Sequence, residues 1–404
     1  MPGGSRVRPG IVVSPIWNMG HADACSPDRT AGQRIGRDAG RDGTSRASAG
    51  HNASVRIGRI LAATVVVLAA VASLLAYARV QSRRTVNLAP TGEHAVGRVT
   101  DLWVDRSRTD QFAPVGGTPR VLSTWVWYPA EAGTRGPESA YAPGAWKALH
   151  RFGWATTDFN HIRTGTRDGV PGARGRFPVV VLLPDLGMSA PQYTAIAAGL
   201  AARGNVVVGV TPTYSSRLSV IDGRQVGASA AGSAAGRAEQ LVAVWAADAR
   251  FAAERAVLQF GGRVDGSKIA YVGHGLGGTA AIEACRVDGR CSGAVSLDGA
   301  PDRTAVSDGF GRPLLVLGAG DSPIAPVGHA YILTGAGRLS FTDYAAYHVS
   351  PPVRWGLPLG TIDGQLALTI TVDYAGSFLR SAFSGSAWEA SAYAEVRDAA
   401  TLRR

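Results

Sequence analysis

The fold of this 404-residue chain is decided by the stretch Lys268-Ile269-Ala270-Tyr271-Val272-Gly273-His274-Gly275-Leu276-Gly277-Gly278. The residues from Ile269 to Val272 are apolar and rich in branched and aromatic side chains, which favours a buried strand. Glycines then follow at alternate positions and allow a tight turn. The stretch therefore predicts a strand that runs through a glycine turn into a helix.

This turn matches a catalytic pattern but lacks its reactive residue. In Gly-x-Ser-x-Gly the serine sits on a sharp strand-to-helix turn, which exposes its hydroxyl for nucleophilic attack. The chain keeps the outer glycines, Gly273 and Gly277, and has Gly275 at the serine position. His274 and Leu276 flank the vacant position and are candidate binding residues. The segment thus predicts a nucleophile turn without a nucleophile.

Apolar runs of strand length alternate with helical patterns from about residue 92 onward. This pattern predicts an α/β fold with a mainly parallel central sheet flanked by helices. Phe177–Leu183 is unbroken in its apolar character, as expected of a strand buried on both faces. Runs 99–104 and 121–128 predict antiparallel edge strands. The other predicted strands are 205–210, 268–272, 293–297, 313–317 and 330–333, and the predicted helices are 191–203, 233–259, 276–286 and 363–381.

An apolar segment near the N-terminus sets the predicted domain organisation. The nineteen residues from Ile60 to Ala78 carry no charge. A helix of that length, at ~1.5 Å per residue, nearly matches the ~30 Å hydrocarbon layer of a membrane. We predict a disordered basic tail over 1–55, a transmembrane helix or signal anchor over 56–84, an α/β domain over 90–384 and a C-terminal tail over 385–404.

The sequence leaves two fates open for the apolar segment. Its length and the long basic stretch before it favour an uncleaved anchor, which makes the chain a single-pass cell-membrane protein with an extracytoplasmic domain. Cleavage at Ala76-Tyr77-Ala78, which has the small-x-small form of a signal-peptide site, would instead release a secreted domain. Arginines lie on both sides of the segment, so the positive-inside rule does not decide the orientation.

The formal net charge of +11 is concentrated outside the predicted domain. Residues 1–59 hold nine Arg against four Asp, and Arg79, Arg83 and Arg84 follow closely. The remaining chain is nearly balanced in charge. We therefore do not expect nucleic acid as a partner.

Two of the three cysteines, Cys285 and Cys291, close a short loop after the predicted helix 276–286. A disulfide there suits an exported domain, and a pair of small buried residues suits the sequence equally well. Cys25 lies in the predicted tail. No His/Cys cluster has the spacing of zinc ligands, so we predict no metal and no cofactor.

A series of short motifs occurs in a telling order: Pro90-Thr91-Gly92 with Val96-Gly97, Asp105-Arg106-Ser107-Arg108, Trp127-Tyr128-Pro129-Ala130, Phe177-Pro178-Val179-Val180, Gly273-His274-x-x-Gly277-Gly278, Leu297-Asp298-Gly299 and Phe341-Thr342-Asp343. Over about residues 90–384 the chain thereby resembles the bacterial α/β-hydrolases similar to platelet-activating-factor acetylhydrolase. The resemblance implies an esterase or lipase that uses a Ser-Asp-His triad in that chain order. It also implies short acyl or phospholipid esters as substrates and an exported or lipid-facing location.

The family's catalytic positions fall on altered residues in this chain. The nucleophile position is Gly275 and the acid position is Asp298. The histidine of the family's His-x-x-Phe-x-Asp segment is replaced by Arg338. The turn that supplies an oxyanion donor in the family contains Asp185 and Leu186 here. A carboxylate at Asp185 opposes developing negative charge if it faces the site, and is neutral in effect if it faces solvent.

These replacements predict a loss of catalysis. Gly275 has no hydroxyl, and Arg338 stays protonated and cannot act as a general base. Loss of the serine alone costs roughly 10⁶ in rate in a serine hydrolase, and loss of the base as well adds little. We predict that Arg338 now pairs with Asp298, bidentately and within about 6 Å, where the imidazole once stood.

Three functions compete on this basis. The first is a pseudohydrolase that binds an ester, lipid or peptide ligand in the old acyl pocket or offers the fold as a partner surface. The second is an active hydrolase with non-standard groups, using His274 or His348 with Asp298. The third is a scaffold whose pocket has filled with side chains. An open cleft at Gly275 favours the first two, and a filled one favours the third.

Overall fold

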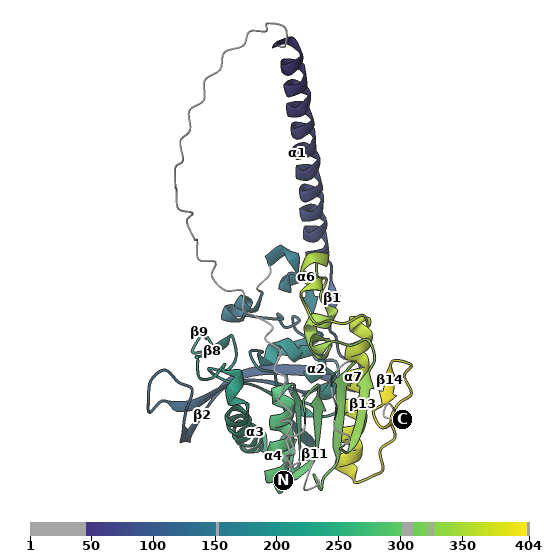
Figure 1. Ribbon diagram of the computed structural model, residues 1–404. Coiled ribbons are helices and arrows are strands. Elements are labelled where there is room, and N and C mark those ends of the chain that lie inside the picture. The colour runs from purple at the N-terminus through teal and green to yellow at the C-terminus, as the bar shows by residue number, and fades with distance from the viewer. Residues whose placement is uncertain are drawn as a thin grey trace, which may run out of the picture. The chain divides into compact units, whose positions relative to one another are not determined.

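The computed structural model in Figure 1 describes residues 46–150, 153–300, 310–320, 322, 324 and 327–401, with side chains from residue 58 onward. The chain divides into two compact units, residues 1–74 and residues 75–404. The second unit holds the sheet and all the candidate site residues.

Helix α1 (Arg46–Ser82) carries the apolar segment. By length and composition, residues Gly58–Ser82 are apolar enough to cross a membrane, with a mean hydropathy of 2.5. The predicted disordered tail over 1–55 is wrong for residues 46–55, which are helical. Alanines in this stretch favour a helix. The rest of the predicted tail, residues 1–45, lies outside the described residues.

A ten-stranded sheet forms the centre of the domain, in the order β14-β13-β12-β11-β10-β6-β7-β3-β2-β5. The strands from β7 to β13 in that order are parallel, while β3 runs antiparallel to both β2 and β7. The predicted mainly parallel sheet with an antiparallel edge is confirmed. The strands are β2 (Ala95–Thr109), β3 (Pro119–Ala130), β5 (Thr166–Asp168), β6 (Phe177–Leu183), β7 (Val206–Thr211), β10 (Val264–His274), β11 (Cys291–Leu297), β12 (Leu314–Ala319), β13 (His329–Leu333) and β14 (Val396–Asp398).

Helices cover both faces of this sheet, as Figure 1 shows for α3, α4 and α7. Alternate residues of β6 enter different cores: Val180 and Leu182 pack on one side, and Val179 and Val181 on the other. Because both faces are buried, the strand needs apolar side chains at every position. The helices are α2 (Thr194–Ala202) and α7 (Gly364–Ser384) on the first side, and α3 (Ala238–Phe260) and α4 (Leu276–Val287) on the second.

The connecting segments that lack a clear sequence period carry short elements. They are β1 (Val86–Asn87) paired with β4 (Ile162–Arg163), the β8 (Ser219–Ile221) and β9 (Arg224–Val226) hairpin, helix α6 (Pro351–Trp355), and the 3₁₀ helices η1 (Gly144–Leu149), η2 (Gly153–Ala155), η3 (Phe159–His161), η4 (Ala190–Tyr193), η5 (Ala235–Arg237), η6 (Gly261–Arg263), η7 (Arg338–Phe341) and η8 (Asp343–Ala346). Two of them, η4 and η7, help to build the candidate site.

The C-terminal segment is part of the domain. The predicted tail over 385–404 is wrong for Val396–Asp398, which form β14 and pair antiparallel with β13 at the edge of the sheet, while residues 402–404 lie outside the described residues. Trp388 packs its ring against Phe378 and Tyr374 of α7, with centroids 5.4 and 5.8 Å apart. Burial of these aromatic rings holds the segment against the domain.

Cys285 and Cys291 form a disulfide that joins the end of α4 to the start of β11. Their Cα atoms lie 5.2 Å apart, within the usual range for such a bond. Of the two interpretations that the sequence left open, the structure has the disulfide.

Candidate functional site

The candidate site lies where several parallel strands end. Asp185 follows β6, Gly275 follows β10 and Asp298 follows β11. Arg338 begins η7, after β13. Parallel neighbours end at the same edge of a sheet, so residues far apart in sequence meet there. This topology brings the predicted site residues together.

The turn keeps the backbone of a nucleophile turn although its serine is absent. Gly275 has φ +54° and ψ −121°, a conformation that is strained for a residue with a side chain. Its N–H donates to the carbonyl of Leu297 at 2.8 Å. The flanking glycines are needed for packing, because a Cβ at Gly273 would collide with the Gly277 carbonyl. The turn is therefore intact, and a glycine at its apex adopts it without strain.

An ion pair fills the place of the missing side chain. The guanidinium of Arg338 binds the carboxylate of Asp185 through two hydrogen bonds, Nε to Oδ2 at 2.7 Å and Nη2 to Oδ1 at 2.8 Å. A Cβ added to Gly275 would collide with both of these groups. The space in which a nucleophile would stand is occupied by the pair.

Asp185 also takes the backbone donor of the turn. Its Oδ1 accepts the N–H of Leu276 at 3.0 Å. In this type of turn, the N–H of the residue after the nucleophile position helps to bind the substrate oxyanion. The Asp185 carboxylate therefore lies where an oxyanion would lie. Of the two orientations that the sequence left open for Asp185, the structure has the one that faces the site, with the residue only 8% exposed.

The charges of the pair are mutually stabilised. Burial alone would raise the pKa of Asp185, but the Arg338 charge, with His274 and the hydrogen bonds, outweighs it and holds that pKa below the ordinary value of 3.8. Burial likewise acts to lower the pKa of Arg338, but the carboxylate of Asp185 raises it overall. Both groups are ionised at neutral pH.

Asp298 lies beside the pair and has partners of its own. Its Oδ1 accepts from the backbone N–H of Ala319 at 3.1 Å and from the hydroxyl of Ser322. Its Oδ2 lies 3.6 Å from Nη1 of Arg338. Arg338 thus reaches Asp298, but the predicted bidentate pairing with it is wrong, because Asp185 takes both hydrogen bonds. The empty apex at Gly275 leaves room for the long guanidinium to pass over the turn to Asp185.

The two histidines proposed as substitutes are engaged elsewhere. His274 is 1% exposed, and its Nδ1 lies 2.8 Å from the hydroxyl of Tyr193. Burial lowers the pKa of His274, against an opposing effect of the Asp185 charge. His348 donates its backbone N–H to the hydroxyl of Thr157 at 2.7 Å. Within the described part of the chain, neither imidazole hydrogen-bonds to Asp298.

Several site residues escaped the sequence reasoning. The hydroxyl of Tyr193, at the end of η4, accepts the backbone N–H of Asp185 at 3.0 Å and so positions that turn. Ser322 was not anticipated as a partner of Asp298. Leu186, predicted to line the site, is half-buried and packs against the core beneath α3 and α4. Nothing in the sequence marks Tyr193, ten residues after the end of β6, as the residue that positions the Asp185 turn.

A buried carboxylate fixes the segment that carries Arg338. Asp343, at the start of η8, accepts the backbone N–H groups of Thr194 and Ala195 at 2.8 and 2.9 Å. The hydroxyl of Tyr141 donates to it at 2.9 Å. Burial raises the pKa of Asp343 to about 7, although these three donors act to lower it. The carboxylate thus ties the Arg338 segment to the N-terminus of α2.

The described residues contain no group of three or more His, Cys, Asp or Glu side chains placed to hold a metal ion. The charges at the site, from Asp185, Asp298 and Arg338, are arranged around one another. The arrangement is a closed polar cluster at the apex of the turn.

The chain was then compared with known proteins. Neither family models nor curated proteins gave a match. Among solved structures, it is similar to a ferulic acid esterase from Streptomyces cinnamoneus, with a TM-score of 0.67 and 28% identity over 78% of this chain and 99% of that chain. The narrower resemblance to relatives of platelet-activating-factor acetylhydrolase stays a prediction. Taken with the parallel sheet and the strand-turn-helix at Gly275, the similarity gives this chain an esterase-like α/β-hydrolase fold.

Proposed function

We propose that this protein is a membrane-anchored, extracytoplasmic pseudohydrolase that acts through binding rather than through ester hydrolysis. The observation that carries the proposal is the ion pair of Asp185 and Arg338, which fills the nucleophile position over Gly275. A filled position is the result that favours a scaffold among the three functions considered, so we assign the binding to a partner surface elsewhere on the fold rather than to an ester at the old catalytic centre.

Each step of acyl transfer lacks its group at this site. No hydroxyl stands at Gly275, and Arg338 in the histidine position holds its proton. The Leu276 N–H, which would stabilise an oxyanion, is already bound by Asp185. A substrate carbonyl would have to displace an ion-paired carboxylate before it could be polarised. These three features together support a loss of hydrolysis.

The location has separate support. The apolar segment Gly58–Ser82 suits a single membrane span. Near its end, Ala78 and Ser82 are 2% and 4% exposed, and the Ser82 carbonyl accepts the N–H of Asp158 at 2.8 Å. Residues around the signal-peptidase-like sequence are thus packed within the folded unit, which favours an uncleaved anchor. The disulfide of Cys285 and Cys291 favours an oxidising compartment.

The decisive test is turnover by the purified full chain in detergent. We expect hydrolysis of p-nitrophenyl butyrate and of methyl ferulate at the buffer rate, and no labelling by a fluorophosphonate. The ferulate ester is included because the similar solved structure is a ferulic acid esterase. Turnover that disappears in Asp298→Asn or His274→Ala would overturn the proposal and establish a hydrolase with non-standard groups.

A reverse test asks whether the ion pair is what closes the site. Gly275→Ser with Arg338→His restores the triad residues, but Asp185 would still occupy the oxyanion position. We therefore expect the double variant to stay inactive and the triple variant with Asp185→Gly to hydrolyse p-nitrophenyl butyrate. Equal activity of the two variants would show that Asp185 does not block the site.

Anchoring is tested by the mass of the protein recovered from membranes. We expect an intact chain of 41.8 kDa that resists extraction by alkaline carbonate. A product beginning at Arg79 in the medium would show that the segment is a cleaved signal peptide. In a Cys25→Ser variant, labelling of thiols only after reduction would place Cys285 and Cys291 in the disulfide.

A further inference from the structure

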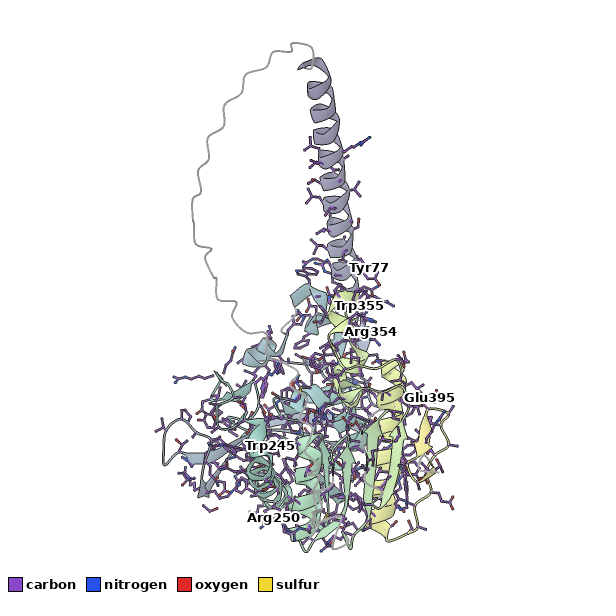
Figure 2. The ribbon with its side chains drawn as sticks, viewed as in Figure 1. Tyr77, Trp245, Arg250, Arg354, Trp355 and Glu395 are labelled. Atoms are coloured by element: carbon purple, nitrogen blue, oxygen red, sulfur yellow. A yellow bond between two sulfur atoms is a disulfide. The ribbon has the colours of Figure 1, made fainter. Side chains whose placement is uncertain are left out.

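One end of the folded unit exposes large apolar side chains of a kind that a soluble domain usually buries. Figure 2 shows Tyr77, Arg354 and Trp355 at this end of the domain. Trp355 is 84% exposed, Tyr77 49% and Trp154 45%. Val80, one turn after Tyr77, is 64% exposed. We call Tyr77, Val80, Trp154, Arg354 and Trp355 the interfacial surface.

Backbone hydrogen bonds hold these side chains on one framework. Ser350, which precedes α6, donates its N–H to the carbonyl of Ala155 in η2 at 2.9 Å. Asp158, just after η2, donates its N–H to the carbonyl of Ser82 at the end of α1 at 2.8 Å. The segments that carry Trp355, Trp154 and Tyr77 are therefore joined in series within one unit. Their exposure belongs to a structured surface.

The same end of the domain is basic. Arg79, Arg83 and Arg84, in and after the last turn of α1, are exposed, and so is Arg354 in α6. Indole and phenol rings favour the headgroup region of a bilayer, and nearby arginines favour anionic lipids by roughly 1 kcal/mol each. Aromatic rings interspersed with arginines are therefore the chemistry of a membrane interface.

A second exposed apolar region lies on α3 and β2. Leu258 of α3 is 75% exposed, and it lines a surface groove of about 400 Å³ together with Val104 of β2. Among the residues that the structure describes, no apolar chain segment leads to that groove, so nothing there identifies an occupant. At the interfacial surface, by contrast, the apolar segment Gly58–Ser82 ends among the residues concerned.

We propose that the interfacial surface seats on an anionic lipid bilayer, with the rings of Trp355 and Trp154 in the headgroup region. The proposal rests on the membrane anchoring proposed above and goes beyond it. An anchor alone leaves the domain free to tumble on its helix. A second contact through α6 and η2 fixes which face of the domain is turned away from the lipid.

Tryptophan quenching by brominated lipid tests this contact on the full chain in nanodiscs. Discs contain phosphatidylcholine and phosphatidylglycerol, with the phosphatidylcholine either plain or brominated. We expect Trp355→Phe to lose about half of the quenching that the two interfacial indoles share, and the variant with Trp154→Phe in addition to lose most of it. Trp388→Phe is the matched control, because its half-buried ring packs on α7.

The outcomes separate the contact from the anchor. If the chain fails to co-elute with nanodiscs, the proposed anchoring fails. If it co-elutes and Trp355→Phe leaves the quenching unchanged, the anchor stands and the lipid contact is overturned. In that case the interfacial surface is open to a protein partner.

A charge variant tests the preference for anionic lipid. The fraction of brominated phosphatidylcholine is held constant. We expect tryptophan quenching by that lipid to rise when phosphatidylglycerol replaces half of the plain phosphatidylcholine, and we expect Arg354→Gln to reduce the rise. Arg250→Gln is the control, since Arg250 is exposed on α3 at the other end of the domain in Figure 2. An equal effect of the two substitutions would show that the charge contribution is not local to α6, and would contradict the proposal.

Discussion

Two of the arginines that bind carboxylates in this domain, Arg120 and Arg338, lie in opposite surroundings. Arg120 of β3 is 1% exposed and reaches Asp110 at 2.7 Å and Asp248 at 2.6 Å. Arg338 is 40% exposed and reaches Asp185 at 2.7 Å. The first network joins β3 to α3 in the interior of the domain. The second stands at the apex of a turn that in related folds holds a nucleophile.

The two ion pairs differ in their role. The Arg120 pair supports the fold, whereas the Arg338 pair fills the space over Gly275. Breaking a fully buried pair leaves a charge without water or partner, which is costly. A pair with one partly exposed member regains solvent when it is broken, so its contribution to stability is small. The ion-pair distances of Arg120 and Arg338 are nearly the same, yet breaking the two pairs has different effects on stability. Arg338 matters for the space that it fills more than for the stability that it adds.

The largest loss of stability is expected for Arg120→Met, which tests the role of the buried pair. This variant leaves Asp110 buried without its cation and Asp248 with Arg108 alone, and we expect the free energy of unfolding to fall by about 3–5 kcal/mol. Urea unfolding followed by circular dichroism measures the change. Arg108→Met is the matched control: Arg108 binds the same Asp248 at 2.9 Å but is 27% exposed. A loss at Arg120 no larger than that at Arg108 would contradict the assigned role.

The next largest effect is expected for Gly275→Ala. The added methyl collides with the ion pair and must adopt φ +54°. We expect a loss of about 2–3 kcal/mol in unfolding free energy, from overpacking and backbone strain together. Combining the substitution with Asp185→Gly removes the collision with Asp185 but leaves the one with Arg338, so the added loss should become smaller without falling to the backbone strain alone. An unchanged loss would place the collision elsewhere.

A smaller effect is expected for Arg338→Met. The carboxylate of Asp185 loses its cation but keeps the N–H of Leu276, and partial exposure allows water to approach. We expect a loss of about 1–2 kcal/mol. In the double variant with Asp185→Asn the loss should be smaller than in Arg338→Met, because position 185 then holds no carboxylate that lacks its cation. Additive losses would mean that the two groups are not coupled.

The smallest effect is a dependence on acid. The pKa of Asp185 lies below its ordinary value of 3.8, because Arg338 outweighs the effect of burial. The contribution of the pair is therefore complete above about pH 4 and is lost as the pH falls through the depressed pKa. The stability gap between the wild type and Arg338→Met should be constant from pH 7 to 5 and close toward pH 3. A gap that widens in acid would contradict the pairing.

Much of the fold could be predicted because its strands are buried on both faces. The unbroken apolar run of β6 has one physical explanation, and its predicted bounds agree with Phe177–Leu183. Strand β10 begins at Val264 rather than at Lys268, because its polar first residues pair with β6 across a register shift. The short strand β14 was missed, since three residues at a sheet edge carry no periodic signal.

The site could be predicted only in part. Chain order places Gly275, Asp298 and Arg338 at one edge of the sheet, and the structure brings them together. The partner of Arg338 was inferred from the position it inherits, which gave Asp298. The available signal was a carboxylate at Asp185 and a guanidinium at Arg338, at positions that the fold brings to the glycine at the apex of the turn. The sequence alone does not show that a glycine at the apex leaves room for both the Asp185 and the Arg338 side chains.

The three-residue strand β14 has a consequence for how the chain can be shortened. It covers the outer edge of β13, whose backbone groups would otherwise be unpaired. A protein ending before Val396 would display that edge, with Tyr331 and its aromatic neighbours beside it. We expect such a truncation to associate edge to edge, because β13 would then offer unpaired backbone groups to the same edge of another molecule.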